Sequence, residues 1–134
     1  MENYSVVKKL FLLITILFSL KSFSQKEADA ILGKWITIPG KTIIIGVSKN
    51  NNEYQGKIVW RKDNDERKPI GFVILEKLRY NSRRNSWDRG KIHDPNSGKT
   101  YSATARIKDD GILEVNGFIG FSFLGRKKNF QRVK

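Results

Sequence analysis

The stretch WDRGKIHDPNSGKTY, residues 87–101, decides the fold of this chain of 134 residues. It places a tight turn, Asp94 to Gly98, between two segments that carry aromatic residues near their outer ends. Pro95 presets φ for an early turn position, the Asp and Asn side chains bond nearby backbone, and Gly98 can adopt a positive φ. We therefore predict a β-hairpin with strands over 86–93 and 100–108, in which Asp94, Pro95 and Gly98 have structural roles.

The segments on either side repeat this pattern of short strands separated by Gly, Asn and Asp. Residues 53–60, for example, alternate so that Tyr54, Gly56, Ile58 and Trp60 share one face, as in a half-buried antiparallel strand. Further strands are predicted over 33–38, 41–48, 72–75, 79–80, 112–118 and 127–133, with a short helical turn over 26–32 and an exposed loop over 61–69. About eight short strands predict an all-β, antiparallel, up-and-down barrel, with a sandwich as the alternative.

The first two dozen residues are typical of an export signal. A pair of lysines precedes an apolar run of 11 residues, 10–20, and the segment 22–24 offers small residues where a signal peptidase cuts. A membrane anchor is the alternative, but the run is shorter than the roughly 18 to 20 residues that span a bilayer. We expect a signal peptide over 1–24 and a single exported domain, periplasmic or secreted, over 25–134.

Charge and cysteine content narrow the classes of function. The chain has 26 basic and 13 acidic residues, a net charge of +13, and the expected leader carries two of these positive charges net, which leaves +11. Such a charge favours anionic surfaces, although basic residues spread along a chain also occur on any solvated surface. The absence of cysteine excludes disulfides, thiolate metal sites and a cysteine nucleophile. Export and scattered charge argue against nucleic acid as a partner.

Landmarks near both ends of the expected domain resemble a known pattern. Gly33 and Trp35 match the Gly-x-Trp opening of lipocalin-like barrels, and Arg132 lies where such barrels carry a basic residue that covers the tryptophan. The other shared landmarks are the segments 56–60, 87–101 and 117–132. Over roughly 31–133 the chain resembles the exported bacterial family catalogued as domain of unknown function 2147. The resemblance implies a small lipocalin-like, calycin-type β-barrel, and it brings no established catalytic or binding residues.

Aromatic and basic side chains are the best candidates for ligand binding. Trp60, Trp87 and Tyr101 fall at positions predicted to face the barrel interior, where small neighbours either make room for packed rings or leave a cavity. Arg89 and Arg126 lie near strand ends, where they would meet an anionic head group, and Arg89 would face a cavity together with Trp87 and Tyr101. The segment 118–123 is apolar and borders basic residues, which favours a docking surface as the alternative.

Catalytic and metal-binding patterns are weak. His93 is the only histidine, and no serine motif accompanies it, so a strand-end role is favoured over a general base. A calcium loop that began at Asp94 would need Gly and a carboxylate where Lys99 and Ala105 stand. No spacing makes two carboxylates converge in a cleft, as a glycosidase requires. We expect no metal and no cofactor.

Three hypotheses of function follow, in order of preference. The first is non-enzymatic binding of a small amphipathic or anionic ligand. The second is an interaction module that docks on an anionic envelope component or a protein partner, and the third is a hydrolase. The oligomeric state and the identity of the ligand do not follow from the residues.

Overall fold

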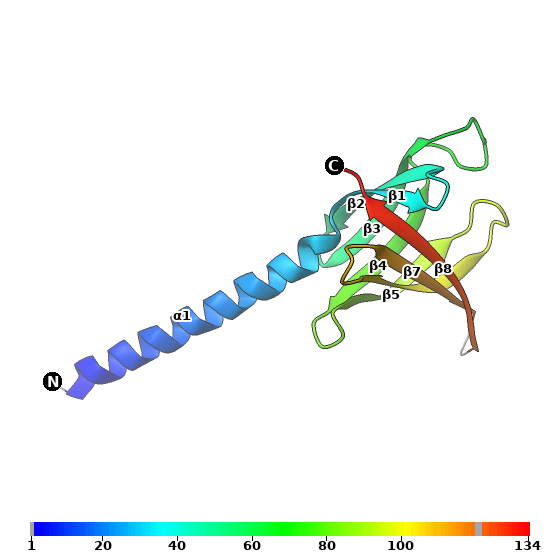
Figure 1. The fold of residues 1–134 in the computed structure, drawn as a ribbon. Helices are drawn as coiled ribbons and strands as arrows, with labels where there is room; N and C mark the ends of the chain where they lie inside the picture. Colours follow the sequence, from blue (N-terminus) through cyan, green and yellow to red (C-terminus); the bar gives the residue numbers. More distant parts are fainter. Residues whose placement is uncertain (1, 120–121) are drawn as a thin grey trace. The chain divides into compact units, whose positions relative to one another are not determined.

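The computed structural model describes residues 2–119 and 122–134, and the chain divides into two compact units. The first ends at Ala30 and contains one long helix, α1 (Glu2–Ala28). The second is Ile31–Lys134, and a 3₁₀ turn, Asp29–Ile31, spans the boundary in the sequence (Figure 1). Among the described residues, no helix combines the length and the apolar character that a membrane span requires.

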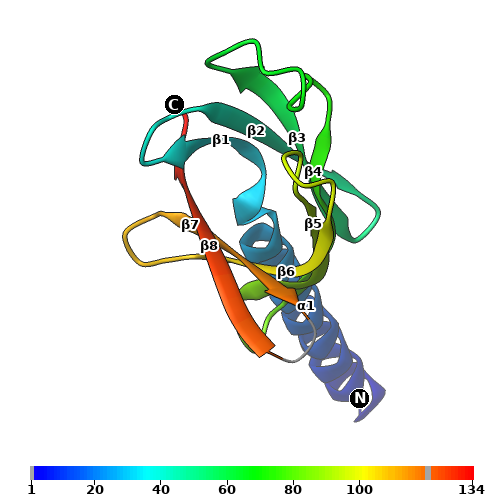
Figure 2. The same ribbon diagram turned by 90° about the vertical axis from the view of Figure 1, so that its right-hand side faces the viewer.

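The second unit is a closed barrel of eight antiparallel strands in sequence order, in which the last strand pairs with the first (Figure 2). The strands are β1 (Gly33–Ile38), β2 (Ile43–Asn50), β3 (Glu53–Arg61), β4 (Val73–Asn81), β5 (Ser86–His93), β6 (Thr100–Ile107), β7 (Leu113–Ile119) and β8 (Ser122–Arg132). The predicted all-β, up-and-down barrel is confirmed. Closure removes the exposed strand edges that an open sheet of this size would leave.

Period-two alternation supplies the core of the barrel. The largest fully buried hydrophobic side chains are Ile31, Trp35, Ile45, Tyr54, Ile58, Leu75, Leu78, Trp87, Leu113 and Val115. A side chain that lines a water-sized void keeps accessible surface, so their burial means that the interior around them is filled. Each contributes about 1.5 to 3 kcal/mol through the area it removes from water.

The two ends of the barrel differ. We call the end formed by the turns 51–52, 82–85 and 108–112 the Gly33 end, because β1 begins there. The opposite end, formed by the connections 39–42, 62–72 and 94–99, is the Asp94 end.

Trp35 closes the interior at the Gly33 end. Its indole is 1% exposed, and Nε1 donates a hydrogen bond to the Ile31 carbonyl at 2.9 Å. The Arg132 guanidinium lies 4.1 Å from the centre of the Trp35 ring and donates to the Leu32 carbonyl at 2.9 Å. Gly33 has φ of 116°, and a Cβ there would lie only 3.1 Å from an Arg132 nitrogen, so a side chain at this position would disturb the cation–π contact.

Strand β4 runs without interruption, whereas two separate segments were predicted. Lys77 lies within it at φ of 58°, an unusual conformation for a residue with a Cβ. Around this point the pairing of β4 with β3 shifts register twice, between Tyr54 and Lys57. An irregularity therefore bends the strand where the sequence pattern indicated a break.

Candidate functional site

The structure separates the aromatic candidates. Trp87 is 2% exposed and packs against the Tyr80 ring at 5.2 Å between centroids, which makes it a core residue beyond the reach of a ligand. The prediction that Trp60 faces the interior is wrong, because its side chain is 42% exposed. A bulge in β3 is the cause. Ile45 pairs with Ile58 and Ile44 pairs with Trp60, so β3 has one extra residue between these two pairs, and the Trp60 side chain lies on the outer face of the barrel.

The same kind of irregularity displaces Arg89. Its predicted position facing the interior is wrong: Arg89 is exposed and has φ of 60°. Trp87 pairs with Ala105 and Gly90 pairs with Ala103, so β5 carries one residue more than β6 between these pairs. Gly90 therefore takes the inner position that regular alternation would give to Arg89.

Tyr101 lies at the Asp94 end and is only half-buried. It pairs with Ile92, which is also half-buried. A Cβ built on Gly117 would lie 3.4 Å from Ile92 Cγ2 and 3.9 Å from Tyr101 Cβ, so these three residues adjoin on the inner face. This inner apolar surface remains partly accessible, unlike the core below it.

Strand β8 adds cations to the inner face at this end. Phe130 is buried, and it pairs with Leu113 on one side and with Thr37 on the other. Side chains two residues apart share a face, so Lys128 and Arg126 follow Phe130 on the inner side, where they pair with Val115 and Gly117.

Both of these cations are nevertheless exposed. The pairing of β1 with β8 ends at Ile38 and Asn129, so no β1 residue lies beside Lys128 or Arg126. The inner face of β8 therefore reaches solvent at the Asp94 end.

The turn over 94–98 is held by its own side chains. The Asp94 carboxylate accepts hydrogen bonds from the Asn96 amide at 2.9 Å and from Ser97 Oγ at 2.8 Å, and Gly98 has φ of 72°. These hydrogen bonds lower the pKa of Asp94, and the charge of Arg126 lowers it further. The carboxylate thus stays ionised in mildly acidic solution, and Arg126 is electrostatically coupled to this turn.

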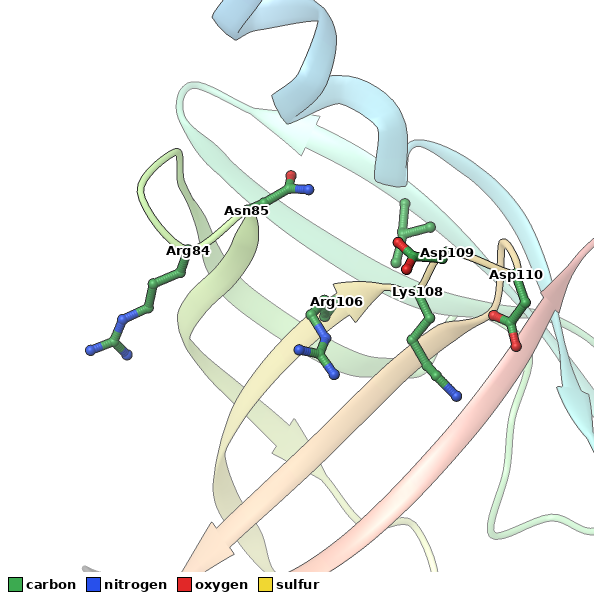
Figure 3. Close-up of a pocket in the computed structure, with 7 residues that line it drawn as sticks. Arg84, Asn85, Arg106, Lys108, Asp109 and Asp110 are labelled. Atoms are coloured by element: carbon green, nitrogen blue, oxygen red, sulfur yellow. The ribbon is translucent and has the colours of Figure 1, made fainter.

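A separate polar cleft of about 430 Å³ lies at the Gly33 end (Figure 3). Its lining residues are Arg84, Asn85, Arg106, Ile107, Lys108, Asp109 and Asp110. They come from the 82–85 turn and from the end of β6 with the turn that follows. Sequence analysis missed this cleft, because the two turns are more than 20 residues apart and their basic residues resemble an ordinary solvated surface.

A second hollow, of about 400 Å³, bears on the hydrolase hypothesis because Glu53 and Glu76 both line it. Arg79 Nη2 lies 2.9 Å from Glu53 Oε1, and His93 Nε2 lies 3.2 Å from Glu76 Oε1. His93 Nδ1 is 2.8 Å from Thr100 Oγ1. The imidazole thus links three neighbouring strands, and each carboxylate already faces a basic or imidazole partner, which is the arrangement of a cross-strand network.

Part of the predicted docking segment, 118–123, lies outside the described residues, at positions 120 and 121. Phe118 is half-buried on β7. Arg61, at the end of β3, donates to the carbonyls of Asp65 and Lys68 at 2.7 and 2.9 Å and so holds the 62–72 connection.

Comparison with known proteins places the barrel in a family. Residues 33–132 match the model of the family described as "Uncharacterized protein conserved in bacteria (DUF2147)". The barrel is also similar to a solved structure titled "Protein HP1028 from the human pathogen Helicobacter pylori belongs to the lipocalin family". That likeness has 18% identity and a TM-score of 0.63 over 78% of this chain and 83% of the other, and it shows the fold alone. No curated protein matches the chain.

Proposed function

Because the chain belongs to the DUF2147 family of uncharacterized bacterial proteins, its function must be argued from its own surfaces, and we propose that it binds a small amphipathic anion without catalysis. The observation that carries this proposal is the inner face of the Asp94 end, where apolar and cationic side chains adjoin. The half-buried pair Ile92 and Tyr101 offers apolar surface on β5 and β6. Lys128 and Arg126 lie on the inner face of β8, and Gly117 of β7 lies between them and this pair.

The packing of the core limits where such a ligand would lie. Val115 and Phe130, one step deeper on the same faces, are buried, so a ligand would rest across the end of the barrel. Its apolar part would cover Tyr101 and Ile92 while its carboxylate or phosphate meets Arg126 and Lys128. Opposite charges at a partly desolvated site supply orientation, and the apolar area supplies affinity.

Binding of dodecanoate, measured by isothermal titration calorimetry, tests this proposal. We expect the double variant Arg126→Ala, Lys128→Ala to weaken binding about 10-fold or more, equivalent to about 1.4 kcal/mol or more. Lys127→Ala is the matched control, because Lys127 alternates to the outer face and should leave the affinity unchanged. Added salt should weaken binding of dodecanoate but not of dodecanol.

Two outcomes would contradict the proposal: no measurable binding of dodecanoate, or full affinity in the double variant. A Gly117→Leu variant adds a second readout. The new side chain would occupy the inner face beside Ile92 and Tyr101, so it should block dodecanoate and dodecanol alike.

We also propose that the barrel is exported after removal of residues 1–24. The basic pair followed by an 11-residue apolar run supports this, as do the small residues before Gln25. Expression of the full chain in a bacterium, followed by cell fractionation and mass spectrometry, should recover a periplasmic or secreted form that begins near Gln25. Recovery of the uncleaved chain in the cytosol would contradict export.

A further inference from the structure

Exposed apolar side chains gather at one place on the barrel. Among the described residues of the barrel unit, the exposed large hydrophobic residues are Val59, Trp60 and Ile70. The first two are adjacent near the end of β3, and Ile70 lies beside that strand because the Gly71 amide donates to the Ile58 carbonyl at 2.7 Å. Single exposed hydrophobic residues are common on any protein, but a contiguous group of them indicates an interaction surface.

The bulge in β3 produces this surface. Trp60 pairs with Ile44 across the irregularity, which leaves Val59 as the extra residue. Val59 Cγ1 lies 3.0 Å from the position that a Cβ on Gly46 would take, so the Val59 side chain covers the outer face of β2. Two consecutive apolar side chains therefore lie on the outside of the barrel, whereas regular alternation would place one of them inside.

Apolar residues of β1 and β2 continue the surface. Ile36 of β1 pairs with Ile44 of β2, which pairs with Trp60 of β3, so the three form one row across strands that lie side by side (Figure 2). Ile36 and Ile44 are half-buried, and each alternates with buried inner residues, which places its side chain on the outer face. We call Ile36, Ile44, Val59, Trp60 and Ile70 the Trp60 face.

Lysines flank the Trp60 face on both sides. Lys34 of β1 and Lys57 of β3 both pair with Gly46 of β2, so they form the next outer row along the strands. In the other direction, Lys41 and Lys62 are exposed in the connections that follow β1 and β3. The apolar row therefore lies between two pairs of cations.

Acidic residues are few around this face. None occurs in the sequence over 30–52 or 54–62, which includes β1, β2 and most of β3. The connection 61–69 carries three acidic residues but four basic ones, and its Asp65 is paired with Arg67 at 2.9 Å. The surface is thus apolar at its centre and positive at its rim.

This combination of charge and apolar area identifies the partner. A second copy of the chain would bring two positive rims together, which is unfavourable. At a bilayer surface, in contrast, an indole lies at the level of the head groups and lysines attract anionic lipids. We infer that the Trp60 face docks the barrel on a membrane that contains anionic phospholipid. The face lies on the outside of the barrel and the proposed ligand site lies on the inner face at the Asp94 end, so either can fail without the other.

Tryptophan fluorescence of the full chain with lipid vesicles tests the inference, because Trp60 is the exposed one of the three tryptophans. Trp35 and Trp87 are buried and supply a constant background. Vesicles that contain phosphatidylglycerol should shift the emission of Trp60 to shorter wavelength and protect it from acrylamide, and brominated acyl chains should quench it. Vesicles of phosphatidylcholine alone should bind at least about 10-fold more weakly, and added salt should weaken the binding to phosphatidylglycerol.

Variants that keep Trp60 use the same quenching by brominated lipid as their readout. Lys34→Gln with Lys57→Gln should raise the lipid concentration that gives half of the quenching by about 10-fold or more. Arg83→Gln with Lys91→Gln is the matched control, because it removes the same charge from exposed positions on the 82–85 turn and β5 and should change that concentration less than about 2-fold. Ile70→Asp puts a negative charge at an exposed position of the Trp60 face and should weaken docking at least as much as the lysine changes.

Four outcomes would overturn the inference. If vesicles bind the chain but Trp60 stays accessible to acrylamide, the apolar run of α1 is the attachment. Full docking in the Lys34→Gln, Lys57→Gln variant would exclude the lysine rim. Protection of Trp60 that grows with protein concentration in the absence of lipid would identify a second copy as the occupant. Protection by polyglutamate, without quenching by brominated lipid, would identify an acidic protein.

Discussion

Replacement of Trp35 by alanine is expected to lower the free energy of unfolding by about 3 to 5 kcal/mol. The indole is fully buried at the Gly33 end, so its removal leaves a cavity that the surrounding strands cannot close completely. The change also leaves the Ile31 carbonyl without its Nε1 donor and removes the surface on which Arg132 stacks. Because domains of this size have about 5 to 15 kcal/mol of stability, the loss is a large share of the total.

Urea unfolding followed by circular dichroism measures this loss, and Trp60→Ala is its matched control. Trp60 is 42% exposed, so the same substitution there should cost about 1 kcal/mol or less. The pair also tests the bulge in β3, because regular alternation would bury Trp60 as deeply as Ile58. Equal destabilisation of the two variants would contradict the register described for β2 and β3.

Features that depend on local chemistry could be predicted from the sequence. The turn over 94–98 contains proline, glycine and side chains that can bond nearby backbone, and the structure shows such bonds at Asp94, which accepts from the Asn96 amide, and at Ser97, which accepts from the Lys99 amide. The alternating pattern along the chain likewise predicted the strands and the barrel. Such signals act over a few residues, so no knowledge of distant partners was needed.

Features that depend on one extra residue in a strand could not be predicted in this way. The bulges at Trp60 and Arg89 reverse which side chains face inward, and each candidate beyond such a bulge was assigned to the wrong face. Arg89 and Lys77 adopt positive φ although neither is glycine or asparagine, so their residue types give no signal. The strands on both sides impose this conformation through pairing.

The residues of the candidate binding surfaces also divide into those that the local sequence predicts and those that only the fold reveals. Arg126 was identified because it lies near a strand end, but Lys128 emerges only from the register that continues the inner face of β8 past Phe130. The polar cleft forms where two turns that are distant in the sequence lie close together at one end of the barrel, and the spacing of residues along the chain does not indicate that these turns are close. Charge runs such as Arg83-Arg84 therefore indicate a surface, and only the fold indicates which member lines a cleft.

Gly90→Ala is expected to lower the free energy of unfolding by about 1 to 3 kcal/mol, as overpacking of a filled core does. A Cβ at Gly90 would lie 2.7 Å from Leu78 Cγ, closer still to Leu78 Cδ2, and 3.1 Å from the Glu76 carbonyl oxygen. Leu78 is fully buried and Cγ is not the free end of its side chain, so it cannot simply swing aside. Gly117→Ala on β7 is the matched control, because its nearest contact would be an ordinary 3.4 Å.

A double-mutant cycle with Leu78→Ala identifies the cause. Leu78→Ala alone should cost about 2 to 5 kcal/mol through the cavity it creates. If the Cβ at position 90 is destabilising because it strikes Leu78, the double variant should be more stable than the sum of the two single changes predicts, by about 1 kcal/mol or more in thermal or urea unfolding. Strict additivity would instead mean that the backbone of β5 is strained by the methyl group itself, since Gly90 would then act independently of Leu78. A coupled result would place the origin of the β5 bulge in the core: Gly90 is the residue that lets Leu78 fill the barrel, and Arg89 is displaced to the outside as a consequence.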